Sequence, residues 1–221
     1  MAFVRAADSV FTKEEVAIAI THGAFGSHAG IAFHSSKDGA QLLHLQFHRR
    51  LAVDAFPPEH CWIVTRVDLP VVVAKQLVGI VRAIAKRKPL INYAVDCIAA
   101  RGSFDGNGHY KPPRGSKGLT CATFVSEIFR AAKLPLIAEE TWKANDSNFK
   151  WANDVCDLLV KHDADADHVT AVRSSITGLR VRPEELGAAS DMPFRERPVE
   201  FEAVEPCATR VMECLRSTCP L

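Results

Sequence analysis

The stretch Gly118-Leu119-Thr120-Cys121-Ala122-Thr123-Phe124-Val125-Ser126-Glu127-Ile128-Phe129 leads from a loop into a predicted helix. Its apolar residues recur at the spacing of one buried helical face. Cys121 therefore falls in the first turn, where unpaired N–H groups and the positive end of the helix dipole favour a thiolate over a thiol. Such a cysteine is a candidate nucleophile, although most free cysteines are simply small buried residues.

A predicted β-hairpin upstream of this helix carries several histidines. Residues 27–34 are expected to form one strand, residues 35–40 a turn and residues 41–53 the returning strand. Alternation in the second strand places His44, Gln46 and His48 on one face. Because two strands are not stable alone, we expect the hairpin to join a larger sheet, with residues 62–68 as its third strand.

The other elements follow from periodicity and breakers. A helix is predicted from Val71 to Lys86, while residues 16–20 fit either a helix or a strand. Further helices are expected at 149–162, at 169–179 and from Pro183, followed by a strand at 199–204 and a helix at 207–215. The segment from Phe104 to Gly118 is long for a loop, which favours a lid or another functional role. The acidic run 163–167 lacks the EF-hand pattern and is interpreted as a solvated turn.

Composition and charge bear on whether the protein binds nucleic acid or inserts into a membrane. The chain has 221 residues, 48% of them hydrophobic and 24% charged, with a net charge of +1, which is an ordinary globular balance. This charge gives no reason to expect nucleic acid as a partner, and no run is apolar enough to predict stable membrane insertion. The N-terminal segment lacks the apolar region of a secretory signal. We therefore expect a protein that is cytoplasmic in the producing cell, or is secreted by a dedicated, non-Sec system.

The chain contains seven cysteines and no C-x-x-C pair. This pattern lacks the usual zinc spacing and favours a reducing compartment. Cys207, Cys214 and Cys219 are interpreted as ordinary residues of the tail, with a disulfide as the alternative in an oxidising space.

His28 on the first strand, polar residues on the second and Cys121 at a helix start form the set that cysteine hydrolysis needs. A thiolate attacks a carbonyl, a histidine moves the proton, and a third polar side chain orients that histidine. The orienting residue depends on the turn: a turn centred on position 36 places His44 opposite His28, and one centred on position 38 places His48 there. Gln46 shares their face and is a further alternative.

Three motifs resemble those of the circularly permuted papain fold, the branch that holds permuted NlpC-type peptidases and lecithin–retinol acyltransferase-like enzymes. They are Ser27-His28-Ala29-Gly30-Ile31, Leu42-Leu43-His44-Leu45 and Thr120-Cys121-Ala122-Thr123-Phe124-Val125. In that branch the histidine strand precedes the cysteine helix, as it does here. Each motif is short, so the resemblance depends on their order and context.

The resemblance implies an α+β, permuted papain-like (NlpC-like) fold, with an antiparallel sheet packed against a cysteine-bearing helix and extra C-terminal helices. One domain would span residues 1–221, with a core at about 23–136 and an elaboration at about 137–221. Cys121 would be the nucleophile, His28 the general base and His44 the orienting residue. Tyr93 resembles a tyrosine that lines the site in permuted relatives, although it also suits the core. The amide of Cys121 is the expected oxyanion donor.

The leading hypothesis is a cysteine peptidase or amidase that cleaves an amide bond without a metal or other cofactor. The resemblance favours bacterial cell-wall peptide (peptidoglycan) as substrate. A toxin delivered by type VI secretion, with an immunity or secretion partner protein, would follow from that substrate. The alternatives are a thiol acyltransferase or lipase acting on lipid esters, a non-catalytic binding domain of the same fold, and a zinc site formed by His28, His44, His48 and Cys121.

Overall fold

The computed structural model describes residues 3–6, 12–13, 15–23, 26–35, 37–55, 61–98 and 100–219. Its centre is a six-stranded antiparallel sheet in the order β1-β6-β2-β3-β4-β5. The strands are β1 (Val4–Arg5), β2 (Val16–Gly23), β3 (Gly26–Ser35), β4 (Gly39–Phe47), β5 (Arg50–Ala55) and β6 (Ile63–Arg66). A separate small hairpin pairs β7 (Ser103–Phe104) with β8 (Tyr110–Lys111).

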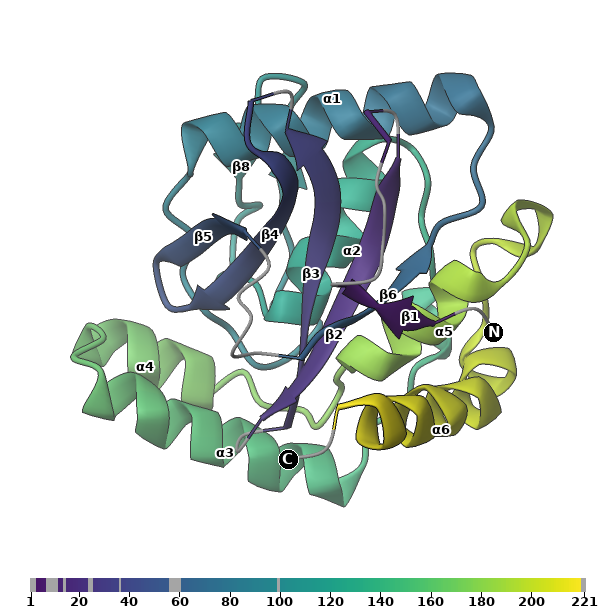
Figure 1. The fold of residues 1–221 in the computed structure, drawn as a ribbon. Coiled ribbons are helices and arrows are strands. Elements are labelled where there is room, and N and C mark those ends of the chain that lie inside the picture. Colours follow the sequence, from purple (N-terminus) through teal and green to yellow (C-terminus); the bar gives the residue numbers. More distant parts are fainter. Residues whose placement is uncertain are drawn as a thin grey trace.

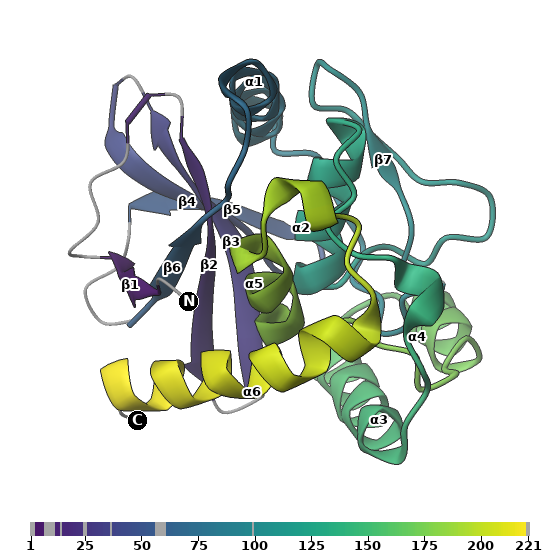
Figure 2. The same ribbon diagram turned by 90° about the vertical axis from the view of Figure 1, so that its right-hand side faces the viewer.

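Helices α1, α2 and α5 lie on one side of the sheet, and α3 and α4 lie at one end of it (Figures 1 and 2). The α-helices are α1 (Val71–Arg87), α2 (Cys121–Ala131), α3 (Asp146–Lys161), α4 (Ala166–Arg173), α5 (Pro183–Asp191) and α6 (Phe201–Thr218). Two short 3-10 helices are η2 (Glu139–Thr141) and η3 (Phe194–Glu196). Within the described ranges, none of the helices has the length and apolar character that a membrane crossing requires.

Helix α2 lies between the sheet and the β7–β8 hairpin (Figure 2). This central place explains why its residues from Cys121 to Phe129 are all buried. The helix begins at a capping box. The hydroxyl of Thr120 accepts the amide of Thr123 at 3.0 Å, and the amide of Thr120 donates to the hydroxyl of Thr123 at 2.8 Å. Cys121 is consequently fixed as the first helical residue, as predicted.

The sheet agrees with the predicted α+β class and antiparallel pairing, and α1 occupies the predicted segment. Residues 16–20, for which helix and strand were both open, belong to β2. The third strand is present as β6, but it pairs with β2 and β1 rather than with the hairpin's second strand.

The predicted returning strand at 41–53 is present over residues 41–47 but is too long, because the chain turns back after Phe47 and makes a further strand. His48 and Arg49 form the turn, and Arg49 has a φ of 57°. A left-handed turn at a non-glycine residue carries little sequence signal, so the alternation was extended through it. As a result, β5 pairs with β4 and brings its own side chains to the face of β4 that carries His44.

In the tail, the predicted strand at 199–204 is wrong and the terminal helix is longer than predicted. Helix α6 starts at Phe201 and buries residues at helical spacing: Val204, Ala208, Val211 and Leu215. That period extends through Pro206 and outweighs the short apolar run at the start. Helix α4 ends at Arg173, before Gly178, which has a φ of 79°. The acidic run is only partly a turn, since Asp165 caps α4 by accepting the amides of Asp167 and His168.

Cys219 is not an ordinary tail residue. It forms a disulfide with Cys61, with the two Cα atoms 5.4 Å apart and 158 residues between them in sequence. The bond fastens the end of α6 to the segment just before β6. No local pattern marks a pair so distant in the chain, and the disulfide weakens the expectation of a reducing compartment.

Candidate active site

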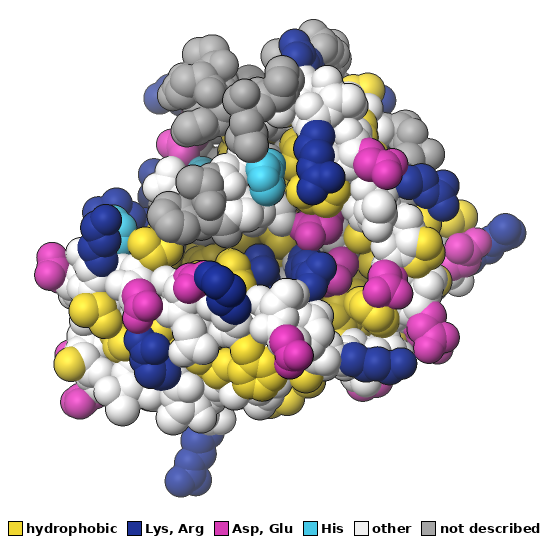
Figure 3. All heavy atoms as spheres, turned by 90° about the horizontal axis from the view of Figure 1, so that it is seen from below, with side chains coloured by type: hydrophobic (Ala, Val, Ile, Leu, Met, Phe, Trp, Pro, Cys, Tyr) yellow, Lys and Arg dark blue, Asp and Glu magenta, His cyan; other side chains and the backbone are white. Residues whose placement is uncertain are grey.

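A cavity of about 430 Å³ lies where the start of α2 meets the hairpin strands, and it brings together Cys121, His28, His44 and Tyr93. Its other walls come from β2, β4 and α3. Figure 3 views this end of the molecule from below and shows histidine, hydrophobic and basic side chains around a hollow. The residues predicted from three distant motifs therefore line one space.

His28 and His44 form a hydrogen-bonded pair. Nε2 of His28 lies 2.9 Å from Nδ1 of His44. The indole of Trp62 lies edge-on to both rings, with centroids 5.9 Å from His28 and 5.6 Å from His44. Burial lowers the pKa of His28 to about 4. At neutral pH its imidazole is therefore uncharged and able to accept a proton.

The register of the hairpin differs from both predicted turns. Ser35 pairs with Gly39, so the turn centres on position 37 rather than on 36 or 38, and position 36 itself lies outside the described residues. In this register Gln46 is level with His28, and His44 approaches it diagonally. The β3–β4 ladder does not continue to that level, although the residues there are described.

Gly30 leaves room for the diagonal approach. A Cβ atom on Gly30 would lie 2.8 Å from Cβ of His44, 2.8 Å from Leu42 and 3.0 Å from the carbonyl of Leu43. These distances are shorter than atomic contacts allow, so any side chain at this position would displace His44. The glycine of the His28-Ala29-Gly30 motif thus has a steric role in the pairing of the two histidines.

Asp54 extends the histidine pair to the surface. Its Oδ2 lies 3.2 Å from Nε2 of His44, and the two side chains are 45% and 9% exposed, respectively. Asp54 is on β5, opposite Leu42, which places it on the same face as His44. The site thus contains a row of three polar side chains: His28, His44 and Asp54.

Cys121 opens onto the same cavity from the start of α2. Burial raises the pKa of its thiol, and the amide of Ala29, the hydroxyl of Tyr93 and the charge of Arg180 oppose part of that rise. The expectation of a thiolate from the helix start alone is therefore wrong for the resting state, because desolvation is the larger effect. In the described part of the chain, no hydrogen bond joins Cys121 to either histidine of the pair.

Tyr93 is held beside Cys121 by its backbone. It makes a parallel β-bridge with Leu119. Its amide donates to Nδ1 of His48 at 3.3 Å, and its carbonyl accepts from Nε2 of His168 at 3.0 Å. His48 therefore contacts the backbone of Tyr93 and the ring of His168 (centroids 4.7 Å apart) instead of orienting His28. Among the described residues, no group of three or more histidine, cysteine or acidic side chains is placed to hold a metal ion. His28, His44, His48 and Cys121 therefore do not form the zinc site considered from the sequence.

Gln46 and the long loop have smaller parts in the site than predicted. Gln46 is exposed at the cavity edge, where it lies level with His28 without a hydrogen bond to it in the described chain.

The loop from Phe104 to Gly118 contributes no described lining residue. It folds as the β7–β8 hairpin over α2 and reaches α1, where a Cβ on Gly108 would lie 2.5 Å from the backbone of Ala83. It therefore does not form a lid over the cavity.

The remaining wall is largely apolar and comes partly from the C-terminal region. The hydrophobic lining residues besides Cys121 and Tyr93 are Phe47, Trp62, Trp151, Val155 and Leu158, the last three from α3. Arg180 stacks on Trp151, with Cζ 3.4 Å from the ring centroid, and places a positive charge behind this wall.

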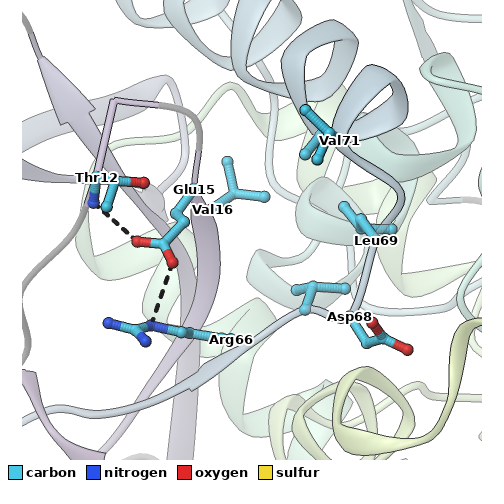
Figure 4. A pocket seen from close by; sticks show the side chains of 9 residues that line it. Thr12, Glu15, Val16, Arg66, Asp68, Leu69 and Val71 are labelled. Carbon is cyan, nitrogen blue, oxygen red and sulfur yellow. Dashed lines mark hydrogen bonds and ion pairs between the residues drawn. The ribbon is translucent and has the colours of Figure 1, made fainter.

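A second cavity, of about 420 Å³, differs from the first in the side chains that line it (Figure 4). It lies between the start of β2, the end of β6 and the start of α1. Glu15 crosses it to Arg66 at 3.7 Å and also accepts the amide of Thr12 at 2.8 Å. Its described lining holds no cysteine or histidine, so it offers no nucleophile and no imidazole base.

Sequence reasoning missed three residues of the site: Asp54, Trp62 and Arg180. For Asp54 the missing information was the turn at His48 and Arg49, since a strand pairing across that turn would have placed residue 54 on the face of His44. Trp62 was included in a strand, but only the sheet order brings it beside the histidines. Arg180 lay in a segment with no clear signal.

No protein-family model, curated protein or solved structure matches this chain. The function is therefore argued from the geometry of the site and from the motifs themselves.

Proposed function

We propose that this protein is a cysteine hydrolase with a permuted papain-like fold that cleaves an amide bond through an acyl-enzyme on Cys121. The observation that supports the proposal most strongly is that Cys121 opens onto the same cavity as the hydrogen-bonded pair His28–His44. A nucleophile, a base and a residue that orients the base are the groups this chemistry requires.

His28 would move protons in both halves of the reaction. Its imidazole takes the thiol proton as Sγ of Cys121 attacks the substrate carbonyl, and it returns that proton to the leaving nitrogen as the C–N bond breaks. Water then attacks the thioester while His28 takes a proton from it, and His28 returns that proton to Sγ of Cys121 as the C–S bond breaks and the acid product leaves. Because the pKa of His28 is lowered to about 4, the imidazole is in its basic form at neutral pH.

The oxyanion of each tetrahedral intermediate would be stabilised at the start of α2. The first intrahelical hydrogen bond is donated by Phe124 to the carbonyl of Thr120. The amide of Cys121 precedes it and takes no part in the helical ladder. An N–H group next to the nucleophile, at the positive end of the helix dipole, suits a developing negative charge.

Proton transfer from Cys121 to His28 requires the thiol and the imidazole to come within hydrogen-bond distance, which side-chain motion or a bound substrate would allow. Catalytic hydrogen bonds are often long in the absence of substrate and shorten in the complex. The raised thiol pKa keeps the thiolate a minor form when no substrate is bound.

The test is a panel of acyl p-nitroanilides and p-nitrophenyl esters with short and long acyl groups, assayed with the wild-type protein, Cys121→Ala and His28→Ala. Turnover should depend on both residues, and mass spectrometry of the stopped reaction should locate the acyl group on Cys121. Turnover that survives in Cys121→Ala would contradict the proposal.

A second candidate, thiol acyltransferase or lipase activity on lipid esters, is favoured by the apolar wall. Phe47, Trp151 and Leu158 suit a fatty acyl group better than a charged peptide. The acyl-enzyme would be the same and only the acceptor would differ. Incubation with vesicles that contain labelled phosphatidylcholine distinguishes the two, because only the second candidate predicts a labelled acyl chain on Cys121.

Cell-wall peptide is the more specific substrate hypothesis, and it carries with it the proposed secretion and immunity partners. Digestion of purified peptidoglycan, analysed by mass spectrometry, tests it. New fragments that depend on Cys121 would support it, and an unchanged fragment pattern would exclude that substrate.

A further inference from the structure

We infer that Asp54 is a positioning residue: through His44 it fixes the tautomer of His28, so that Nδ1 of His28 carries the free lone pair. The inference deepens the proposed function and rests on it. It begins from two contacts in a row, Nε2 of His28 to Nδ1 of His44 at 2.9 Å and Nε2 of His44 to Oδ2 of Asp54 at 3.2 Å.

The direction of the row is set at its outer end. A carboxylate accepts hydrogen bonds and does not donate them, so the contact at Asp54 requires a hydrogen on Nε2 of His44. When the His44 ring is neutral, it carries only this one hydrogen. In that form Nδ1 of His44 is an acceptor, and the contact with it requires a hydrogen on Nε2 of His28.

The same count applies to His28. Its low pKa keeps the ring neutral at pH 7, so with Nε2 protonated its Nδ1 has a lone pair and no hydrogen. That nitrogen is the one available to take the thiol proton of Cys121. If the row ran the other way, Nδ1 would carry the hydrogen and His28 could not accept a proton from the thiol.

The burial of the three side chains suits this division of roles. His44 is 9% exposed and Asp54 is 45% exposed, so the carboxylate keeps its hydration while it polarises a buried ring. The strand positions hold the row in place, since Asp54 is opposite Leu42 and Ala52 is opposite His44 in the β4–β5 ladder. Asp54 does not touch the reacting atoms and acts only through its contact with His44.

Nitrogen NMR of labelled protein tests the inference without any substrate. In the wild type we expect both His28 and His44 to be protonated at Nε2. In Asp54→Ala we expect His44 to shift toward the Nδ1-protonated form and His28 to follow it. Asp54→Glu should restore the wild-type tautomers at least in part. Asp38→Asn, which changes an aspartate in the β3–β4 turn, is the matched control for Asp54→Asn.

A chemical readout accompanies the spectra. The rate of iodoacetamide alkylation of Cys121 should fall about 10- to 100-fold in Asp54→Ala and Asp54→Asn, recover in Asp54→Glu and stay unchanged in Asp38→Asn. If Asp54→Ala does not fold, Asp54→Asn takes its place in both measurements.

Identical tautomers in wild type, Asp54→Ala and Asp54→Asn would overturn the inference, even with full hydrolase activity. Failure of the proposed hydrolase function would give a different combination of results in these two measurements. In that case the tautomers would depend on Asp54 as expected, while His28→Ala would leave the alkylation of Cys121 unchanged.

Discussion

The segment from Gly26 to Ala131 and the C-terminal helices contribute different things to the candidate site. The first region supplies the reactive groups: Cys121, His28, His44 and Asp54. The second supplies part of the apolar wall, through Trp151 and neighbouring residues of α3, and the charge of Arg180 behind it. This difference suggests a division between the region that carries the chemistry and a separately shaped binding surface. Changes in the first region should lower kcat, and changes in the second should alter KM and substrate choice.

The largest effect is expected at the nucleophile. Cys121→Ala should lower turnover of the best acyl substrate about 10⁴-fold or more, because no other described cysteine lines the cavity. The measurement is steady-state kinetics beside a thermal melt. Cys207→Ala, the same change at a partly buried free cysteine of α6, is the control and should keep full activity. Equal losses in both variants would contradict the assignment.

The next effect tests the packing of the histidine pair. Gly30→Ala should lower kcat about 100-fold, since the added methyl group displaces His44 from its contact with His28. KM should change little because Gly30 is not in the wall. Gly79→Ala is the matched control: a Cβ there meets no atom within 4 Å, and alanine suits the middle of α1. A normal kcat in folded Gly30→Ala would show that the pairing of His28 and His44 is not needed.

A smaller effect is expected in the wall. Leu158→Ala should raise KM for substrates with long acyl groups about 10-fold and leave kcat within about 2-fold, because it removes apolar contact area and no reacting group. Val160→Ala, on the same helix but 58% exposed and outside the cavity, should have no effect. If Leu158→Ala lowered kcat as strongly as Gly30→Ala, the division between the two regions would not hold.

The smallest effect concerns stability in acid. The pKa of His28 is lowered by burial, so between its ordinary value near 6.5 and about 4 the unfolded chain binds a proton that the folded protein does not. Stability should therefore fall as the pH falls through this range. The cost is on the order of 1 kcal/mol, because His28 is only partly buried.

Urea denaturation at several pH values would measure this effect. His28→Gln should reduce the loss, and His48, whose pKa is also lowered to about 4, should account for part of the remainder. His162→Gln, at an exposed histidine that makes no ion pair with any described residue, is the control. A His28→Gln protein with an unchanged pH dependence would exclude His28 as a source of the acid sensitivity.

The part of the site on helix α2 could be predicted from the sequence better than the part on the strands. The start of α2 and the position of Cys121 follow from local signals, namely helical spacing and a polar cap. The partners of His28 depend on register, and a shift of one position in the turn changes which residue is opposite it. Only the paired strands show that His44 reaches His28 diagonally past Gly30 and that β5 adds Asp54.

The C-terminal region was predicted least well, for a related reason. Its helices are short or interrupted, and their boundaries depend on packing against the sheet rather than on local propensity. The disulfide between Cys61 and Cys219 and the stacking of Arg180 on Trp151 join residues far apart in sequence. A single sequence contains no record of such contacts, so the wall of the cavity could be seen only in the fold.

The most direct test of the Cys121–His28 pair is the pH dependence of iodoacetamide labelling at each free cysteine. If His28 exchanges a proton with Cys121, the reactive fraction is fixed between their two titrations. Cys121 should then label at a nearly constant rate from about pH 5 to about pH 8, while Cys207 labels faster by about tenfold per pH unit.

In His28→Ala this plateau should disappear, and labelling of Cys121 should become slow and rise only at high pH, as its raised pKa requires. A wild-type Cys121 whose labelling rises in parallel with that of Cys207, and which is unaffected by His28→Ala, would contradict the account.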